Sequence, residues 1–282
     1  MRVPGEDKRT EQDGIYMVDI FVRKASLFER VFPQVHADAT LVPNEVVNPA
    51  GLTEPERREE SRTEMTVSQQ VATAVALRSL GHVVPPDGAE VVAVQSGAPA
   101  DGKVRAGDVI VELEDKEIKS DRDLFQAMRG RRPGATVSLT VRRGGRTVEL
   151  RVGTRAAANN PARAVMGIII QTEFHFPVDI KIDAGGIGGP SAGLAFALDI
   201  VDELGEDVDG GRKVAVTGAL DLDGEVVAIG GIKQKTIGAR LSGAEVFVVP
   251  DDNAAEARRY ADGLRIIAVS TFEEALSALT KR

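Results

Sequence analysis

With 282 residues, 43% of them hydrophobic and 28% charged, the chain is long enough to bury one large core or two modest ones. Its net charge of -8 argues against nucleic-acid binding, because phosphate recognition needs a basic face. The lack of cysteine excludes thiol nucleophiles, disulfides and thiolate metal sites. The sequence also lacks the long apolar run that would predict a membrane span or a signal peptide. We therefore expect a soluble chain without metal or cofactor.

The first predicted elements are a strand and a helix separated by a charged stretch. Residues 14–24 (GIYMVDIFVRK) alternate apolar and polar side chains, which predicts a strand with one buried face. Residues 54–64 (EPERREESRTE) carry dense mixed charge, which is typical of a solvated or mobile loop. From residue 68 to 80 apolar residues recur at helical spacing, and Gly81 is a natural stop, which predicts a helix packed on a core.

Residues 85–88 (PPDG) break the chain, and a β-rich segment follows. Short strand-like runs separated by glycine turns lead to a hairpin at Gly144-Gly145, with one helix at residues 120–130 (SDRDLFQAMRG). The turn Gly-Ala-Pro-Ala at 97–100, the run Ala-Gly-Asp-Val-Ile at 106–110 and the turn Arg-Arg-Pro-Gly before a strand resemble the corresponding parts of bacterial PDZ domains.

PDZ domains usually bind an extended peptide as an added strand on a sheet edge. The resemblance implies a groove along residues 89–94, lined by Val91, Val92 and Val94, with residues 83–88 as the loop that receives a terminal carboxylate. The implied partner is a peptide or a protein C-terminus. A PDZ domain that serves only as a spacer or a gate is the alternative.

A linker at residues 156–162 leads into a second α/β pattern. Strands are predicted at 167–172, 178–183, 213–218, 225–230, 245–250 and 264–270. Helices are predicted to begin at Ser191, near Lys233, near Asn253 and after Thr271, where Glu274 completes a capping-box spacing. The pattern indicates a mixed α+β domain.

A glycine-rich turn, DAGGIGGPSAG, places Ser191 at or next to the N-terminus of a predicted helix. Free backbone N–H groups and the helix dipole there suit an oxyanion or a phosphate. The turn alone is also compatible with a structural role or with a phosphate-binding enzyme.

A second motif favours a catalytic role for this turn over a structural or phosphate-binding role. Gly-Pro-Ser-Ala-Gly at 189–193, followed 42 residues after its serine by the first lysine of Gly-Gly-Ile-Lys-Gln-Lys, resembles the protease domain of the Lon family, S16. The resemblance implies that Ser191 is the nucleophile and Lys233 the general base, that Lys235 is a second, non-catalytic lysine, and that Thr217 contacts the lysine amine. One departure is Gly188, which stands where the family often has an acidic residue.

The chemistry of the residues agrees with a serine and lysine pair. A serine hydroxyl needs a base, and with no cysteine and no plausible histidine and aspartate partners, lysine is the remaining candidate. The pKa of an exposed lysine must fall by about 3 units to give a useful base, and the apolar residues around Lys233 in the sequence offer the necessary desolvation. The amides of the turn Gly189, Pro190, Ser191 are expected to hold the oxyanion.

The order of the motifs predicts an α+β fold in which a Lon-type proteolytic domain, like domain 2 of ribosomal protein S5, is split by a PDZ domain. The expected protease parts are 12–82 and 160–282, with the PDZ domain at 84–156. No G-x-x-x-x-G-K-[ST] motif is present, so we expect an ATP-independent serine endopeptidase that cleaves unfolded or exposed protein segments.

The composite resembles bacterial PDZ-Lon proteins. This resemblance implies a homo-oligomeric ring, an N-terminal membrane anchor outside this chain and a location on the extracytoplasmic face of the bacterial cell membrane. Two other functions stay open at this point. One is a catalytically silent peptide-binding scaffold or chaperone, and the other is a small-molecule kinase of the GHMP type, whose phosphate loop looks like GGIGGPSAG.

Overall fold

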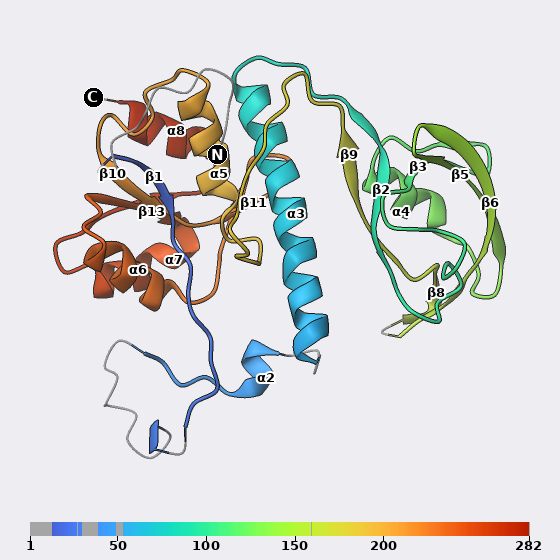
Figure 1. Ribbon diagram of the computed structural model, residues 1–282, viewed down its shortest axis with the longest axis horizontal. Coiled ribbons are helices and arrows are strands. Elements are labelled where there is room, and N and C mark those ends of the chain that lie inside the picture. The colour runs from blue at the N-terminus through green and yellow to red at the C-terminus, as the bar shows by residue number, and fades with distance from the viewer. Residues whose placement is uncertain (1–12, 27, 30–38, 49–52, 159, 282) are drawn as a thin grey trace. The chain divides into compact units, whose positions relative to one another are not determined.

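The structure is a computed structural model that describes residues 13–26, 28–29, 39–48, 53–158 and 160–281. The chain divides into two compact units: an outer unit, made of residues up to 82 and from 178 onward, and an inserted unit of residues 83–177 (Figure 1). The second boundary lies later than the expected 160, because the strand at 168–174 pairs within the inserted unit. The expected domain start at residue 12 lies outside the described residues.

A four-stranded parallel sheet forms the centre of the outer unit. Its strands lie in the order β1 (Gly14–Met17), β10 (Lys213–Val216), β13 (Val246–Pro250) and β14 (Arg265–Val269). A hairpin of β11 (Ala219–Leu220) and β12 (Val226–Val227) follows β10, and a short helix, α2 (Asn44–Val47), follows β1. Every strand of the main sheet is parallel to its neighbour, so both faces need to be covered.

Helices cover the two faces of this sheet. One apolar cluster contains buried residues of α3 (Glu54–Ser79), α5 (Gly193–Glu203) and α8 (Phe272–Thr280), and the other contains those of α6 (Ile232–Leu241) and α7 (Asp251–Tyr260). Val214 and Val216 of β10 join the first cluster, whereas Ala215 joins the second, as the two-residue period of a strand requires. Within the first layer, α3 and α5 lie side by side (Figure 1).

Helix α3 is longer than predicted. It begins at Glu54, so the expected loop at 54–64 is wrong, and the dense charge marks the exposed first turns of a helix. Thr53 caps this start: its N–H and its hydroxyl donate to the Glu56 carboxylate at 2.8 and 2.7 Å, and Pro55 occupies the first turn. Buried residues occur only from Met65 onward, which is where the helix begins to meet the core.

The predicted strand at 178–183 does not form. Ile180 and Ile182 instead pack against the first apolar cluster from an irregular segment. The alternation of apolar and polar residues at 178–183 therefore reflects an irregular segment with one side packed on the core, and not a β-strand paired by backbone hydrogen bonds.

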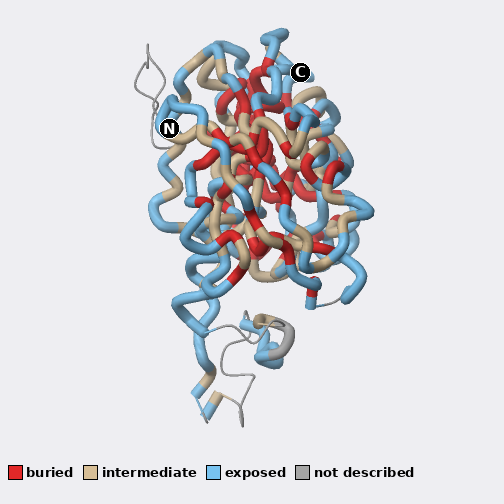
Figure 2. The backbone as a smooth tube through the Cα atoms, turned by 90° about the vertical axis from the view of Figure 1, so that its right-hand side faces the viewer, coloured by how far each residue is buried: buried red, intermediate tan, exposed pale blue. Residues whose placement is uncertain are grey.

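The inserted unit has its own sheet and its own core. The strands lie in the order β6 (Arg146–Gly153), β5 (Thr136–Arg143), β3 (Val109–Leu113), β2 (Pro86–Val94) and β9 (Ile168–Phe174), with β4 (Lys116–Glu117) paired to β3. The helix α4 (Asp121–Met128) and a hairpin of β7 (Arg155–Ala157) and β8 (Asn160–Val165) complete the unit. Figure 2 marks the buried stretches of both units in red.

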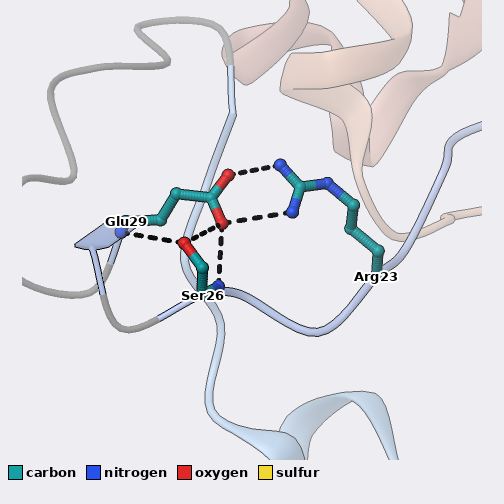
Figure 3. Close-up of polar contacts among 3 residues, drawn as sticks. All are labelled: Arg23, Ser26 and Glu29. Carbon is teal, nitrogen blue, oxygen red and sulfur yellow. Dashed lines mark hydrogen bonds and ion pairs between the residues drawn. The ribbon is translucent and has the colours of Figure 1, made fainter.

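A small polar cluster orders part of the segment that follows β1. The Glu29 carboxylate accepts hydrogen bonds from the Arg23 guanidinium and from the N–H and hydroxyl of Ser26, the last two at 2.8 and 2.9 Å (Figure 3). The Arg23 hydrogen bond, with those from Ser26, lowers the pKa of Glu29 to about 2. This carboxylate is therefore ionised at neutral pH.

Glu173 on β9 gives a test of packing in the inserted unit. Burial, together with the nearby Glu90 carboxylate, raises the pKa of Glu173 from 4.5 to about 7. Because the folded chain holds this proton to higher pH than the unfolded chain, stability falls as the pH rises from about 4.5 to about 7.

We expect Glu173→Gln to raise the free energy of unfolding at pH 8 by about 1–2 kcal/mol and to leave it unchanged at pH 4, measured by urea titration. This value is smaller than the free energy that corresponds to the whole pKa shift of Glu173, because the carboxyl is only half-buried. The exposed Glu149→Gln serves as the control. Equal pH dependence of wild type and Glu173→Gln would contradict the raised pKa of this carboxyl.

Candidate active site

The turn that contains Ser191 lies at the carboxyl edge of the parallel sheet of the outer unit. The Ser191 carbonyl accepts hydrogen bonds from the Gly218 N–H at 2.9 Å and from the Thr217 hydroxyl at 3.3 Å. Thr217 directly follows β10 and is fully buried. Side chains from different elements meet at this edge of a parallel sheet, which is where such folds commonly place ligands.

Lys235 on α6 is the amine beside this serine. Its Nζ donates to Ser191 Oγ at 2.7 Å and to Thr217 Oγ1 at 3.1 Å, and the residue is 2% exposed. A buried amine that contacts a serine hydroxyl can accept its proton once the amine is neutral. The described residues thus bring Ser191, Lys235 and Thr217 together.

The expected pairing of Ser191 with Lys233 is wrong. Lys233 Nζ lies 5.4 Å from the centroid of the Tyr260 ring, where the cation meets an aromatic face. Because α6 begins at Ile232, four of its five buried positions (232, 235, 236 and 239) follow the helical spacing i, i+3, i+4, i+7, and position 233 lies off that stripe. The helical period of this segment therefore identifies Lys235, whereas apolar neighbours in the sequence pointed to Lys233.

Burial determines the charge of Lys235. Desolvation lowers its pKa from 10.5 to about 8, while the negative charge of Asp19 opposes that shift. At pH 7 about a tenth of the molecules would then carry a neutral amine, compared with less than about a thousandth for an exposed lysine. Asp19 follows β1 and was not among the expected site residues.

The start of α6 is contacted by the segment after β1 and by α7. Gly231 caps the helix in a left-handed conformation (φ +72°), and a Cβ there would lie 2.6 Å from Ile20 Cδ1 of the segment after β1. The Asn253 side chain of α7 accepts a hydrogen bond from the Ile229 N–H at 2.8 Å and donates to the Ile229 carbonyl at 3.1 Å. These contacts fix the turn that aims Lys235 at Ser191.

Two of the expected oxyanion-turn residues cannot donate in this structure. The Gly189 N–H donates to the Ser61 carbonyl of α3 at 2.9 Å, and Pro190 has no N–H. The Ser191 N–H is therefore the amide of this turn that can face a substrate carbonyl oxygen. The expected role of Gly189 as an oxyanion donor is corrected by its contact with α3.

The peptide groove expected along Val91, Val92 and Val94 is also corrected. These residues belong to β2, which lies between β3 and β9, and Val91 is fully buried. A strand with neighbours on both sides cannot receive a third. Among the described strands, the free edge on this side of the sheet belongs to β9, which was expected to lie in the protease domain.

Three carboxylates in the outer unit lie close enough to share a cation. They are Asp202, Asp207 and Asp209, whose oxygens lie within 4.8 Å of one another. Each already accepts a backbone N–H from the loop at 208–211, so we assign them to the ordering of that loop.

Comparisons with known proteins match two families along the chain, with boundaries that differ from those of the two units. Residues 61–154 match the PDZ domain family, and residues 153–281 match the family described as Lon protease (S16) C-terminal proteolytic domain. Ser191, Thr217 and Lys235 all lie within the second match. The chain thus contains a proteolytic domain of the Lon type and a PDZ domain.

Two curated relatives illustrate the extent of the likeness. Lon protease 2 of Bacillus subtilis is 38% identical over 105 residues, which are 37% of this chain and 18% of that protein. The Lon protease of Rickettsia bellii is 37% identical over 114 residues, which are 38% of this chain and 15% of that protein. The chain therefore matches less than a fifth of the length of either relative.

Among solved structures, the PDZ domain of the SdrC-like protein of Listeria innocua is 26% identical, with a TM-score of 0.28, and the match covers 30% of this chain and 93% of that one. In the described part of the chain, no helix has the length and apolar character needed to cross a bilayer.

Gly188 provides a test of the packing around the serine turn. A Cβ at this position would lie 2.7 Å from Ser61 Cβ, closer than real Cβ contacts, whereas a Cβ at Gly230 would meet open space. We expect Gly188→Ala to reduce stability by about 1–3 kcal/mol through overpacking against α3, and Gly230→Ala to change it by less than about 0.5 kcal/mol. Urea unfolding of both variants measures the difference, and equal effects would contradict the tight contact with α3.

Proposed function

We propose that this chain is a serine endopeptidase in which Ser191 is the nucleophile and Lys235 the general base. The observation that supports this most directly is the 2.7 Å contact between Lys235 Nζ and Ser191 Oγ, made by a lysine that is 2% exposed. A buried ammonium without a function would be a costly feature, whereas a buried amine with a lowered pKa is what activation of a serine requires.

The reaction follows from the contacts. Ser191 Oγ attacks the carbonyl carbon of a peptide bond, and neutral Lys235 takes the hydroxyl proton as the new C–O bond forms. The Ser191 N–H faces the negative charge that develops on the carbonyl oxygen. Lys235 then returns its proton to the leaving amine, and a water molecule, activated by the same amine, hydrolyses the acyl ester. Thr217 Oγ1 accepts from Lys235 Nζ and holds the amine toward the serine.

The substrates we propose are unfolded or exposed polypeptide segments, cleaved without nucleotide. The chain has no G-x-x-x-x-G-K-[ST] motif and hence no recognisable means of using ATP to unfold a substrate. We retain from the resemblance to bacterial PDZ-Lon proteins the proposals of a homo-oligomeric ring and of an extracytoplasmic location for the full-length protein.

Substitution of the two lysines separates the proposed base from its neighbour. We expect Ser191→Ala and Lys235→Met to lower casein cleavage without nucleotide by at least about 10³-fold, because each removes one half of the nucleophilic pair. Lys233→Met, the matched control two residues away, should stay within about twofold of wild type. Cleavage that depends on Lys233 as strongly as on Lys235, or that survives Ser191→Ala, would contradict the proposal.

The pH profile tests the charge state of Lys235. Only the neutral amine acts as the base, so we expect kcat/KM to rise with pH with a midpoint near 8. Because the charge of Asp19 raises the pKa of Lys235, Asp19→Asn should move the midpoint to lower pH, whereas Asp252→Asn on the exposed start of α7 should not. A midpoint that is unmoved by Asp19→Asn would show that this charge does not act on the base.

For the PDZ domain we propose that peptides bind along the free edge of β9, beside α4. Thr172 of β9 contacts Asp121 of α4, since its hydroxyl donates to the Asp121 carboxylate at 2.8 Å. Phe125 lies one helical turn after Asp121, hence on the same side of α4, and is 50% exposed. The β9 backbone can pair with an extended peptide while Phe125 contacts one of its side chains.

Two variants of the inserted unit test this groove. We expect Phe125→Ala to weaken binding of a labelled peptide with an apolar C-terminal residue by about 5- to 50-fold, because an exposed aromatic contact is lost. Val92→Ala on the inner strand β2 is the control and should change the affinity by less than about twofold. Fluorescence anisotropy measures both, and an unchanged affinity of Phe125→Ala would contradict the groove.

A further inference from the structure

Helix α3 contacts the backbone of the serine turn at two points and the backbone of the residue before this turn at a third. The Ser61 carbonyl accepts from the Gly189 N–H at 2.9 Å, Ser68 Oγ donates to the Pro190 carbonyl at 3.2 Å, and Gln69 Nε2 donates to the Ile182 carbonyl at 3.4 Å. Positions 61 and 68 are two helical turns apart and hence lie on one face of α3. This face therefore holds the chain on the approach to Ser191.

Ser68 makes the contact closest to the proposed nucleophile. The residue is 5% exposed, and a Cβ at Gly193 would lie 3.0 Å from its hydroxyl oxygen, so glycine at this position gives the hydroxyl room. The Pro190 carbonyl also accepts from the Gly193 N–H at 3.3 Å. A side chain of α3 and the first residue of α5 thus hold one carbonyl from two directions.

Because the peptide bond is planar, the hydrogen bond from Ser68 to the Pro190 carbonyl also affects the orientation of the Ser191 N–H. In a trans peptide the Pro190 carbonyl and the Ser191 N–H point in opposite directions within one plane, so a contact that fixes the carbonyl also fixes the N–H. The structure contains no cis peptide bond among its described residues. With the Gly189 N–H bound to Ser61 and no N–H on Pro190, the orientation of the Ser191 N–H determines how this turn meets an oxyanion.

The geometry points to Ser68 as a positioning residue that sets the orientation of the oxyanion-binding amide of Ser191. This inference rests on the proposed peptidase function and adds to it a residue of α3 that contacts neither the reacting hydroxyl nor the base. Loss of a direct oxyanion donor costs about 10²- to 10³-fold in kcat. Ser68 acts through the intervening peptide, so the expected loss is smaller, about 10- to 100-fold.

Two hydroxyl deletions on the same helix test the inference in the full chain. Ser68→Ala removes the contact with Pro190, whereas Thr73→Val removes a buried hydroxyl that donates to the Gln69 carbonyl of its own helix. We expect Ser68→Ala to lower kcat for peptide cleavage by about 10- to 100-fold with KM within about twofold. Thr73→Val should keep both parameters within about twofold of wild type.

A second measurement distinguishes positioning from general damage to the fold. A peptide aldehyde forms a tetrahedral adduct with a serine nucleophile and so reports on the oxyanion site, whereas the non-cleaved amide analogue of the same peptide does not. Ser68→Ala should weaken inhibition by the aldehyde by the same factor as kcat and leave binding of the analogue unchanged. If Ser68→Ala does not fold, Ser68→Cys keeps the side-chain volume with a weaker hydrogen-bond donor. This variant should likewise weaken inhibition by the aldehyde and leave binding of the analogue unchanged.

The outcomes separate this inference from the proposed function. Activity of Ser68→Ala equal to that of Thr73→Val, or equal weakening of aldehyde and analogue, overturns the role of Ser68 and leaves the peptidase in place. A wild-type chain that neither cleaves peptide nor binds the aldehyde overturns both.

Discussion

The burial of one amine determines the arrangement of the proposed site. Lys235 is 2% exposed, and removing a charged amine from water is unfavourable unless its hydrogen bonds are replaced or its charge is given up. Both occur here: Ser191 and Thr217 accept from Nζ, and desolvation lowers the pKa to about 8. The glycine cap of α6 and the Asn253 side chain both hold the start of this helix, and the position of the helix restricts where that amine can lie.

The parallel sheet determines where this amine meets the serine. Ser191 belongs to the layer of α3 and α5, whereas Lys235 belongs to α6 on the other face, and the two meet where β10 ends at Thr217. A side chain from each face can meet only beyond the end of a strand, because within the sheet the backbone separates the two layers. The order of strands and helices therefore determines the site as much as the motifs do.

The sequence predicted the α+β class, the PDZ domain and the Ser191 turn, because each has a local signal. Its errors have a common physical origin in periodicity and pairing. Apolar neighbours in the sequence favour Lys233, whereas the helical period identifies Lys235. Dense charge favours a loop at the start of α3, whereas the cap at Thr53 begins a helix there. Strand β9 pairs with β2 of the inserted unit and not with a strand of the protease domain as expected, because the partner of a strand is not encoded in the strand itself. The contacts from Ser61 and Ser68 to the serine turn join residues more than a hundred positions apart, so no local pattern could have shown them.

The division of the outer unit also gives the protein an order of maturation. The hydroxyl of Ser68 and the carbonyl of Pro190 are separated by 122 positions, and the whole inserted unit lies between them. On the ribosome α3 therefore emerges well before the turn that it supports, and Lys235 emerges later still. A nascent chain therefore holds neither the proposed oxyanion amide in its supported position nor the proposed base until Lys235 has been made. Under the proposed mechanism the site stays inert until Lys235 has been translated, and this delay follows from the order of the elements along the chain.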